Sequence, residues 1–199
     1  MAITNGYASL SQVKAALRIT DAVDDSLLEM AVESASRLID GYAERYFYTG
    51  GTVTRYFATE DPYVVQTDDF RSLVSLKTSS NADGVYDITW AADDYQTEPM
   101  NDFHGGLPWP YTRIRAIGDY TFPSTPENTV ELTAVFGWPN IPTTVTQATI
   151  IQASRIFKRL DSPLGVAGFG DVGVMRVSNS LDPDVRMLVD PYRRMRGIA

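Results

Sequence analysis

The stretch VTQATIIQASRIFKRL, residues Val145–Leu160, opens the part of the chain that says most about the fold. Its apolar residues recur at helical spacing, so it predicts a long helix that Thr143 or Thr144 caps and Pro163 stops. The predicted buried stripe of this helix consists of Val145, Ala148, Ile151 or Gln152, Ile156 and Leu160.

After this helix the sequence predicts a glycine-rich loop at Pro163–Gly173, a short strand at Val174–Val177, a second short helix within Asp182–Arg194, and a basic tail. This part of the chain contains no set of catalytic residues. A loop that orders on contact with a neighbour, followed by a basic tail, suits a protein that docks against copies of itself and against other proteins. We therefore interpret the chain as an assembly component and not as an enzyme.

The N-terminal residues 1–49 predict a helical hairpin. Ser9 followed by Gln12 fits a capping box for a helix that ends near Leu17, and Asp24 or Asp25 can cap a longer second helix. The expected core residues of this second helix, which recur at helical spacing, are Leu27, Leu28, Ala31, Ala35, Leu38, Ile39 and Tyr42.

Residues 50–140 change to period-two patterns that predict an inserted antiparallel β domain. Four segments are expected to be strands: Thr52–Phe57, Tyr63–Thr67, Val85–Trp90 and Thr129–Phe136. Residues 141–199 then supply the long helix, the glycine-rich loop and the short terminal helix. The predicted fold class is α+β: a helical bundle formed by the N- and C-terminal helices, with an inserted antiparallel β domain.

The composition excludes several classes of site. The chain of 199 residues has no cysteine, which excludes disulfides, thiol catalysis and thiolate metal sites, and its single histidine excludes a site with two imidazoles. No apolar run approaches the roughly 18 residues of a membrane helix, and no signal peptide is recognisable, so we expect a protein made in the cytosol without membrane contact. We expect no cofactor and no resident metal.

The net charge of −8 is spread unevenly. From Ile141 onward eight basic residues face five acidic ones, whereas the first 140 residues carry nine basic and twenty acidic residues. Sequence-specific DNA binding is disfavoured for the acidic body, because such proteins carry a basic surface. The basic end can meet an acidic partner surface; the alternative is a solvated terminal helix that carries arginines without a binding role.

Three patterns resemble sites without the context that a site needs. The GFGDVG motif at Gly168–Gly173 follows a helix and precedes a strand, whereas a dinucleotide fingerprint follows a strand and opens a helix. The acidic pairs Asp24–Asp25, Asp68–Asp69 and Asp93–Asp94 lack calcium-loop spacing. The aromatic residues that could stack on a sugar but that fit a core better are Trp90, Trp109, Tyr111 and Trp138.

Two segments resemble the head–tail connector (head-completion, or adaptor) proteins of long-tailed bacteriophages. Leu10–Tyr42 matches the opening of that family, with a short helix ending in Leu-Arg-Ile, an acidic turn and a long helix. Gln147–Arg194, with its QATIIQASRIFKRLDSPLGVAGFG run and its closing Asp-Pro-Asp-Val and Pro-Tyr-Arg-Arg, resembles the actinobacterial-phage branch. Shorter members of the family are almost wholly helical and lack the β region.

The resemblance implies a structural virion protein, a homo-oligomeric ring with twelve copies expected, seated beneath the portal protein at the neck of the particle. Such a ring would join the portal to the next neck, stopper or tail-completion protein after assembly in the host cytoplasm. Double-stranded DNA would pass through the lumen without sequence-specific binding.

We assign two hypothetical contact regions on this basis. The subunit or channel interface loop comprises Pro163, Leu164, Gly165, Gly168, Phe169, Gly170, Val174 and Arg176. The portal-docking tail comprises Tyr192, Arg193, Arg194 and Arg196.

Two other functions remain open from the sequence. The aromatic-rich middle allows a ligand- or carbohydrate-binding β module of a phage particle, which glycan binding would distinguish from a connector. A hydrolase that uses paired carboxylates is the weaker alternative, because no acidic pair lies in a recognisable active-site context.

Overall fold

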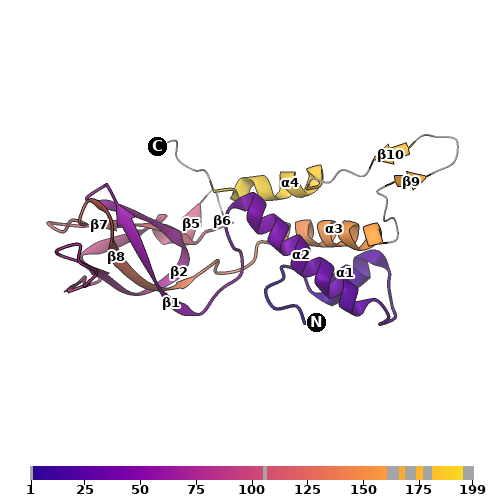
Figure 1. Ribbon diagram of the computed structural model, residues 1–199, viewed down its shortest axis with the longest axis horizontal. Helices are drawn as coiled ribbons and strands as arrows, with labels where there is room; N and C mark the ends of the chain where they lie inside the picture. The colour runs from indigo at the N-terminus through magenta and orange to yellow at the C-terminus, as the bar shows by residue number, and fades with distance from the viewer. Residues whose placement is uncertain (1, 105–106, 161–165, 169–173, 177–180, 195–199) are drawn as a thin grey trace. The chain divides into compact units, whose positions relative to one another are not determined.

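The protein is described by a computed structural model that covers residues 2–104, 107–160, 166–168, 174–176 and 181–194 (Figure 1). The chain divides into two compact units. Residues 1–48 and 141–199 form one, here called the helical unit, and residues 49–140 form the other, here called the β unit. Helices and an antiparallel sheet are both present, which confirms the predicted α+β class.

The helical unit contains α1 (Leu10–Leu17), α2 (Asp25–Ala43), α3 (Thr143–Leu160) and α4 (Pro183–Val189), followed by a 3-10 turn at Asp190–Tyr192. The predicted capping box is confirmed, because Ser9 accepts from the Gln12 amide and the Gln12 side chain accepts from the Ser9 amide. Asp24 is the N-cap residue of α2, although its side chain makes no capping hydrogen bond. Asp182 caps α4 by accepting from the Asp184 amide.

The four helices pack through small apolar side chains. Helix α3 contacts all three other helices, and α1 also contacts α2. The buried residues at the centre are Ala8, Val13, Leu28, Ala31, Val32, Ala35 and Ala153. Alanines at these contacts let the helix axes approach closely, which strengthens dispersion contacts along their length.

The predicted buried faces of α2 and α3 need correction. Leu27 and Leu38 of α2 were expected in the core but are 41% and 47% exposed. They lie at one border of the helical stripe, and the neighbouring helices cover only the other side of α2. For α3 the sequence left open whether Ile151 or Gln152 belongs to the buried stripe. Gln152 is buried, whereas Ile151 is half-buried.

The β unit is built on a six-stranded antiparallel sheet in the order β1-β8-β2-β7-β4, with β3 paired to β2. Its strands are β1 (Thr52–Thr59), β2 (Val64–Thr78), β3 (Ile88–Thr89), β4 (Tyr95–Glu98), β7 (Tyr111–Ala116) and β8 (Thr125–Phe136). Two further short strands, β5 (Phe103–His104) and β6 (Leu107–Pro108), pair with each other.

Two strand predictions in this unit were inaccurate for local reasons. Strand β2 runs far beyond the predicted Thr67, and the register shift between Gln66 and Phe70 absorbs the acidic pair at Asp68–Asp69. Only Ile88–Thr89 of the predicted Val85–Trp90 strand pairs, because the Asp83 and Asp87 carboxylates accept backbone amides and hold turns there. Strands β4 and β7 were not predicted.

The predicted loop at Pro163–Gly173 contains a strand. Strand β9 (Val166–Gly168) pairs antiparallel with β10 (Val174–Arg176), which covers the predicted strand except for Val177, a residue outside the described ones. Helix α4 begins at Pro183, within the segment that predicted the second short helix.

Adjacent leucines on α2 provide a test of its orientation. Leu28→Ala is expected to lower the free energy of unfolding by about 2–5 kcal/mol, because the side chain is fully buried. Leu27→Ala, the matched control one residue away, is expected to cost less than about 1 kcal/mol. Chemical denaturation of both variants measures the difference, and equal losses would contradict this placement of the helix.

Candidate functional site

The C-terminal tail is anchored to the helical unit by Tyr192. This side chain is 4% exposed, its ring contacts Phe47 edge-to-face at 5.8 Å between centroids, and its hydroxyl accepts from Thr144 at 3.0 Å. Because the ring is buried within the unit, Tyr192 positions the tail and does not itself present a surface to a partner.

The two arginines that follow lie beside the end of α2. The Arg193 guanidinium lies 4.9 Å from the centroid of the Tyr42 ring, and the Tyr42 hydroxyl donates to Asp190. The Arg194 amide donates to the Ala43 carbonyl at 2.9 Å. The structure thus brings together three of the four residues of the predicted portal-docking tail, and Arg196 lies outside the described residues.

The predicted interface loop is described only in part. Gly168 ends β9, and Val174 and Arg176 lie in β10, where Val174 is paired with Gly168. The remaining predicted loop residues, Pro163, Leu164, Gly165, Phe169 and Gly170, lie outside the described residues.

A polar cluster that was not predicted holds the N-terminal arm, residues 2–8, against α2. Glu33 accepts from the amides of Thr4 and Asn5, and Ser36 accepts from the amide of Tyr7 at 3.0 Å. These acceptors lie three residues apart on α2, a spacing that places them on one face of the helix. That spacing was visible in the sequence, but the segment that it binds was not.

Asp40 continues the same face and is buried. The Tyr7 hydroxyl donates to the Asp40 carboxylate and accepts from the Phe47 amide at 2.9 Å. Arg37 places its Nε 2.8 Å from Asp40 Oδ2 and donates through Nη2 to the Asn5 carbonyl. The arm, α2 and the chain leaving α2 therefore meet around one carboxylate.

Burial is the main influence on the titration of this cluster. It raises the pKa of Asp40 from 3.8 to about 6, although hydrogen bonds from Tyr7 and the charge of Arg37 act in the opposite direction, and the Glu33 charge adds a small rise. Burial and the neighbouring Asp40 also raise the pKa of Tyr7 well above its ordinary value. Tyr7 is therefore a neutral hydrogen-bond donor at physiological pH.

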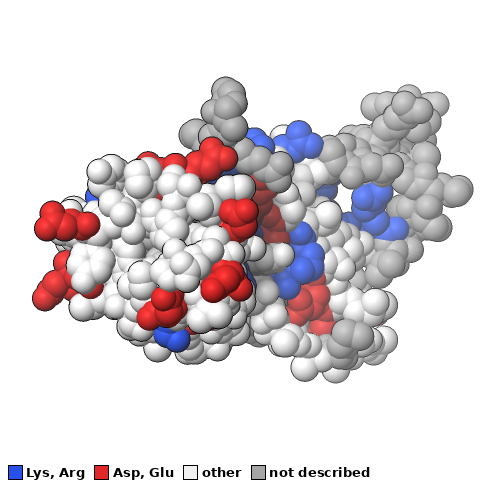
Figure 2. All heavy atoms as spheres, turned by 60° about the vertical axis from the view of Figure 1, so that its left-hand side comes forward, with Lys and Arg blue, Asp and Glu red and all other residues white. Residues whose placement is uncertain are grey.

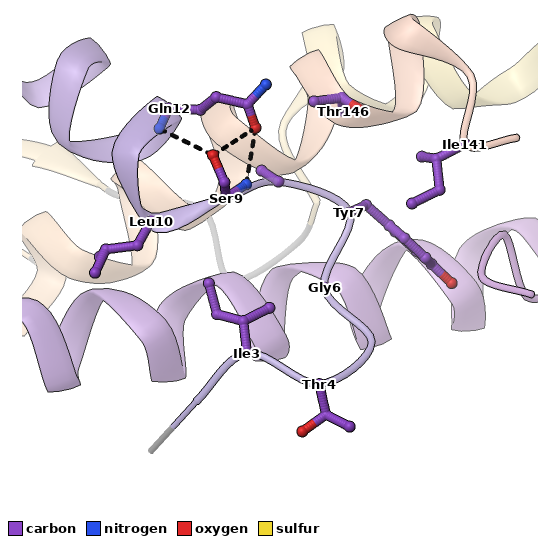
Figure 3. A pocket seen from close by; sticks show the side chains of 10 residues that line it. Ile3, Thr4, Gly6, Tyr7, Ser9, Leu10, Gln12, Ile141 and Thr146 are labelled. Atoms are coloured by element: carbon purple, nitrogen blue, oxygen red, sulfur yellow. Dashed lines mark hydrogen bonds between the residues drawn. The ribbon is translucent and has the colours of Figure 1, made fainter.

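An open pocket of about 460 Å³ lies between the arm and the start of α3 (Figure 3). Its wall includes Ile3, Leu10 and Ile141, together with Ser9 and Gln12. Ser9 and Gln12 are hydrogen-bonded to each other in the capping box, so their polar groups have a structural role. The pocket does not have the converging polar groups of a binding site.

The acidic pairs considered as catalytic candidates make structural contacts. Asp25 pairs with Lys14, Asp68 pairs with Arg55, and Asp94 accepts from the Ala91 amide. Among the described residues, no group of three or more histidine or acidic side chains is arranged to hold a metal ion. In the same part of the chain, no helix is long and apolar enough to cross a membrane.

The aromatic residues of the β unit pack mainly on one another. Trp90 is 5% exposed and stacks on Phe122 at 4.5 Å between centroids, while Trp138 is buried against Trp109 and donates to Asp69. Tyr111 contacts the buried Phe70. These rings contribute to a core and its edge, so they do not form the open platform that sugar stacking requires.

Comparison with known proteins identifies the family that the N-terminal part of the chain matches. Residues 7–79 match the family of phage gp6-like head-tail connector proteins. The match confirms the resemblance predicted from Leu10–Tyr42, which lies inside it, and it extends through β1 and β2. Gln147–Arg194 lies outside the matched segment. No curated protein matches the chain significantly.

Solved structures share the fold over the whole chain. A chain in the neck of an empty gene transfer agent (GTA) particle, computed with C6 symmetry, matches with a TM-score of 0.60 and 15% identity, covering 100% of this chain and 95% of its own. Chains from the neck of the native particle, computed with C12 symmetry, and from the native virion match with TM-scores of 0.57 and 0.56, both at 16% identity and with the same coverage. The β unit is therefore included in the similarity.

The buried carboxylate provides a pH-dependent test of the arm cluster. Because the folded-state pKa of Asp40 is raised, its contribution to stability is present below about pH 4 and is lost as pH rises through 6. The stability of the wild type relative to Asp40→Asn is expected to fall by about 2–3 kcal/mol between pH 4 and 7. Urea denaturation of both proteins across this range measures the difference, in which the other titrating groups cancel. A difference that stays constant with pH would contradict the burial of Asp40.

Proposed function

We propose that this protein is a structural head-to-tail connector that forms a ring beneath the portal and joins the DNA-filled head to the tail. The observation that carries the proposal is the family match over residues 7–79, which contains the arm, α1, α2 and the first two strands. The proposed role is structural and not enzymatic, in accord with acidic pairs that are used in local contacts.

The neck structures with the same fold favour a ring. They belong to particles whose necks were computed with C6 and C12 symmetry, so a closed ring of this chain, with twelve copies expected, is the natural assembly. The proposed location is the virion neck after assembly in the host cytoplasm.

Charge supports passage of DNA without specific binding. The β unit carries thirteen acidic and five basic residues, and Figure 2 shows acidic side chains spread over a face of it. A ring multiplies this negative charge, and an acidic lumen would repel the phosphates and let DNA slide. In this proposal the β unit acts as a domain inserted into a helical bundle built from both ends of the chain.

The two predicted contact regions keep their places in the proposal. The β9–β10 hairpin and the residues around it, from Pro163 to Arg176, would meet the adjacent subunit or the channel. Arg193, Arg194 and Arg196 would dock on the portal, with Tyr192 as the anchor that holds this tail in place. The opposite side of the ring would meet the next neck, stopper or tail-completion protein.

The copy number in purified particles tests the connector function. Quantitative mass spectrometry, scaled to the portal protein, is expected to find as many copies of this chain as of the portal subunit. Absence from finished particles would overturn the proposal, and a copy number far above that of the portal would indicate a shell or tail-tube component.

A charge reversal tests the docking tail. Arg193→Glu combined with Arg194→Glu is expected to block attachment to portal-containing heads, because it replaces two positive charges by negative ones, while the circular dichroism spectrum stays unchanged. Arg186→Glu, at an exposed arginine on α4, is the matched control and is expected to attach normally. Attachment of the double variant at wild-type levels would exclude the tail as the portal contact.

A further inference from the structure

Helix α2 has an exposed uncharged stripe on the side away from its core face. Leu27, Met30 and Leu38 are 41%, 53% and 47% exposed, and Val23 in the preceding turn is 84% exposed. Ser34 and Gly41 are exposed between and after them. Within the helix, the spacing of three and four residues places the other five of these residues on one face, whereas Val23 precedes the helix. The residues of this α2 stripe are Leu27, Met30, Ser34, Leu38 and Gly41.

Gly41 is not required by the packing of the described residues. A Cβ added at this position would meet no described atom within 4 Å apart from its own neighbours and helix backbone, and the residue lies inside a regular helix without a positive φ. Glycine destabilises a helix interior relative to alanine, so a conformational reason for it is lacking here. A glycine in an exposed apolar stripe does allow the backbone of another molecule to approach closely.

We propose that the α2 stripe is the contact face for an adjacent copy of this chain. This inference rests on the proposed ring and names the surface that closes it. In a ring the contact is head-to-tail, so the stripe of one copy packs against a different face of the next copy. The large side chains Leu27, Met30 and Leu38 would form the apolar centre of that contact, where charged residues are normally depleted.

The distribution of charge favours a second copy as the occupant of the stripe. The helical unit carries twelve basic and twelve acidic residues, whereas the β unit carries five and thirteen. Copies of a chain with a net charge of −8 repel one another, and a neutral stripe in the balanced unit is where they can approach with the smallest repulsion. A basic partner would instead be drawn to the acidic side chains of the β unit (Figure 2).

The absence of cysteine from the chain allows a site-specific test. Met30→Cys places a single thiol in the stripe, and Met187→Cys places one at the 72% exposed methionine of α4 as the matched control. Particles are assembled with each variant as the only form of this chain. A thiol-linked benzophenone is activated in the purified particles, and the cross-linked peptides are identified by mass spectrometry.

The two proposals fail in different ways in this experiment. Cross-links from the Met30→Cys thiol to the helical unit of a second copy support the α2 stripe as the contact. Cross-links only to another protein, or none, in particles that contain the chain at the copy number of the portal overturn the stripe while the connector function stands. If complete particles form when neither the wild-type chain nor a variant is present, the connector function itself is overturned.

The Gly41→Leu variant distinguishes an effect on the stability of α2 from an effect on the contact between copies. The variant is expected to raise the denaturation midpoint of the isolated chain, because leucine favours helix, and to lower incorporation into particles at least tenfold, because its side chain fills the stripe. Ala15→Leu, at an exposed position of α1, is the control and is expected to incorporate normally. Normal incorporation of Gly41→Leu would overturn close packing of a second copy at this point.

Discussion

The edge-to-face contacts of Phe47 with Tyr7 and Tyr192 hold the helical unit together. Tyr7 belongs to the N-terminal arm, Phe47 to the chain leaving α2, and Tyr192 to the C-terminal tail, so one buried ring joins three segments that are distant in sequence. Hydrogen bonds fix the same point, because the Tyr7 hydroxyl links the Phe47 amide to Asp40. A unit made from both ends of the chain requires such a closure, since its two parts are separated by the residues of the β unit.

The three faces of helix α2 have different surroundings. One face of the helix packs on α3, a second face binds the arm through Glu33, Ser36 and Asp40, and a third face stays exposed and uncharged. The polar face orders the arm at the cost of burying a carboxylate, and Tyr7 and Arg37 offset this cost only in part, since the pKa of Asp40 remains raised. Among the described residues nothing covers the exposed apolar face, which is the physical reason for assigning it to assembly.

Local patterns predicted much of the fold. The capping box at Ser9 and Gln12, the helical spacing in α2 and α3, and the alternation in β1 and β8 all depend on residues within a few positions of one another. Prediction was poorer where side chains compete with the backbone, as at Asp83 and Asp87, and in β4 and β7, whose sequences YQTE and YTRIRA contain few apolar residues to show alternation. The interface loop and the docking tail were assigned from the family resemblance. No pattern in the sequence indicates that Tyr192 is buried.

By itself the sequence determined the α+β class, the principal helices, the excess of acid in the middle of the chain and the connector family that residues 7–79 match. These features follow from composition and from interactions between near neighbours. Only the tertiary structure decided that Asp40 binds Tyr7, that Gln152 and not Ile151 faces the core, and that Leu27 and Leu38 stay exposed. Each of these depends on which distant segment covers a given face, and helical periodicity alone cannot specify that.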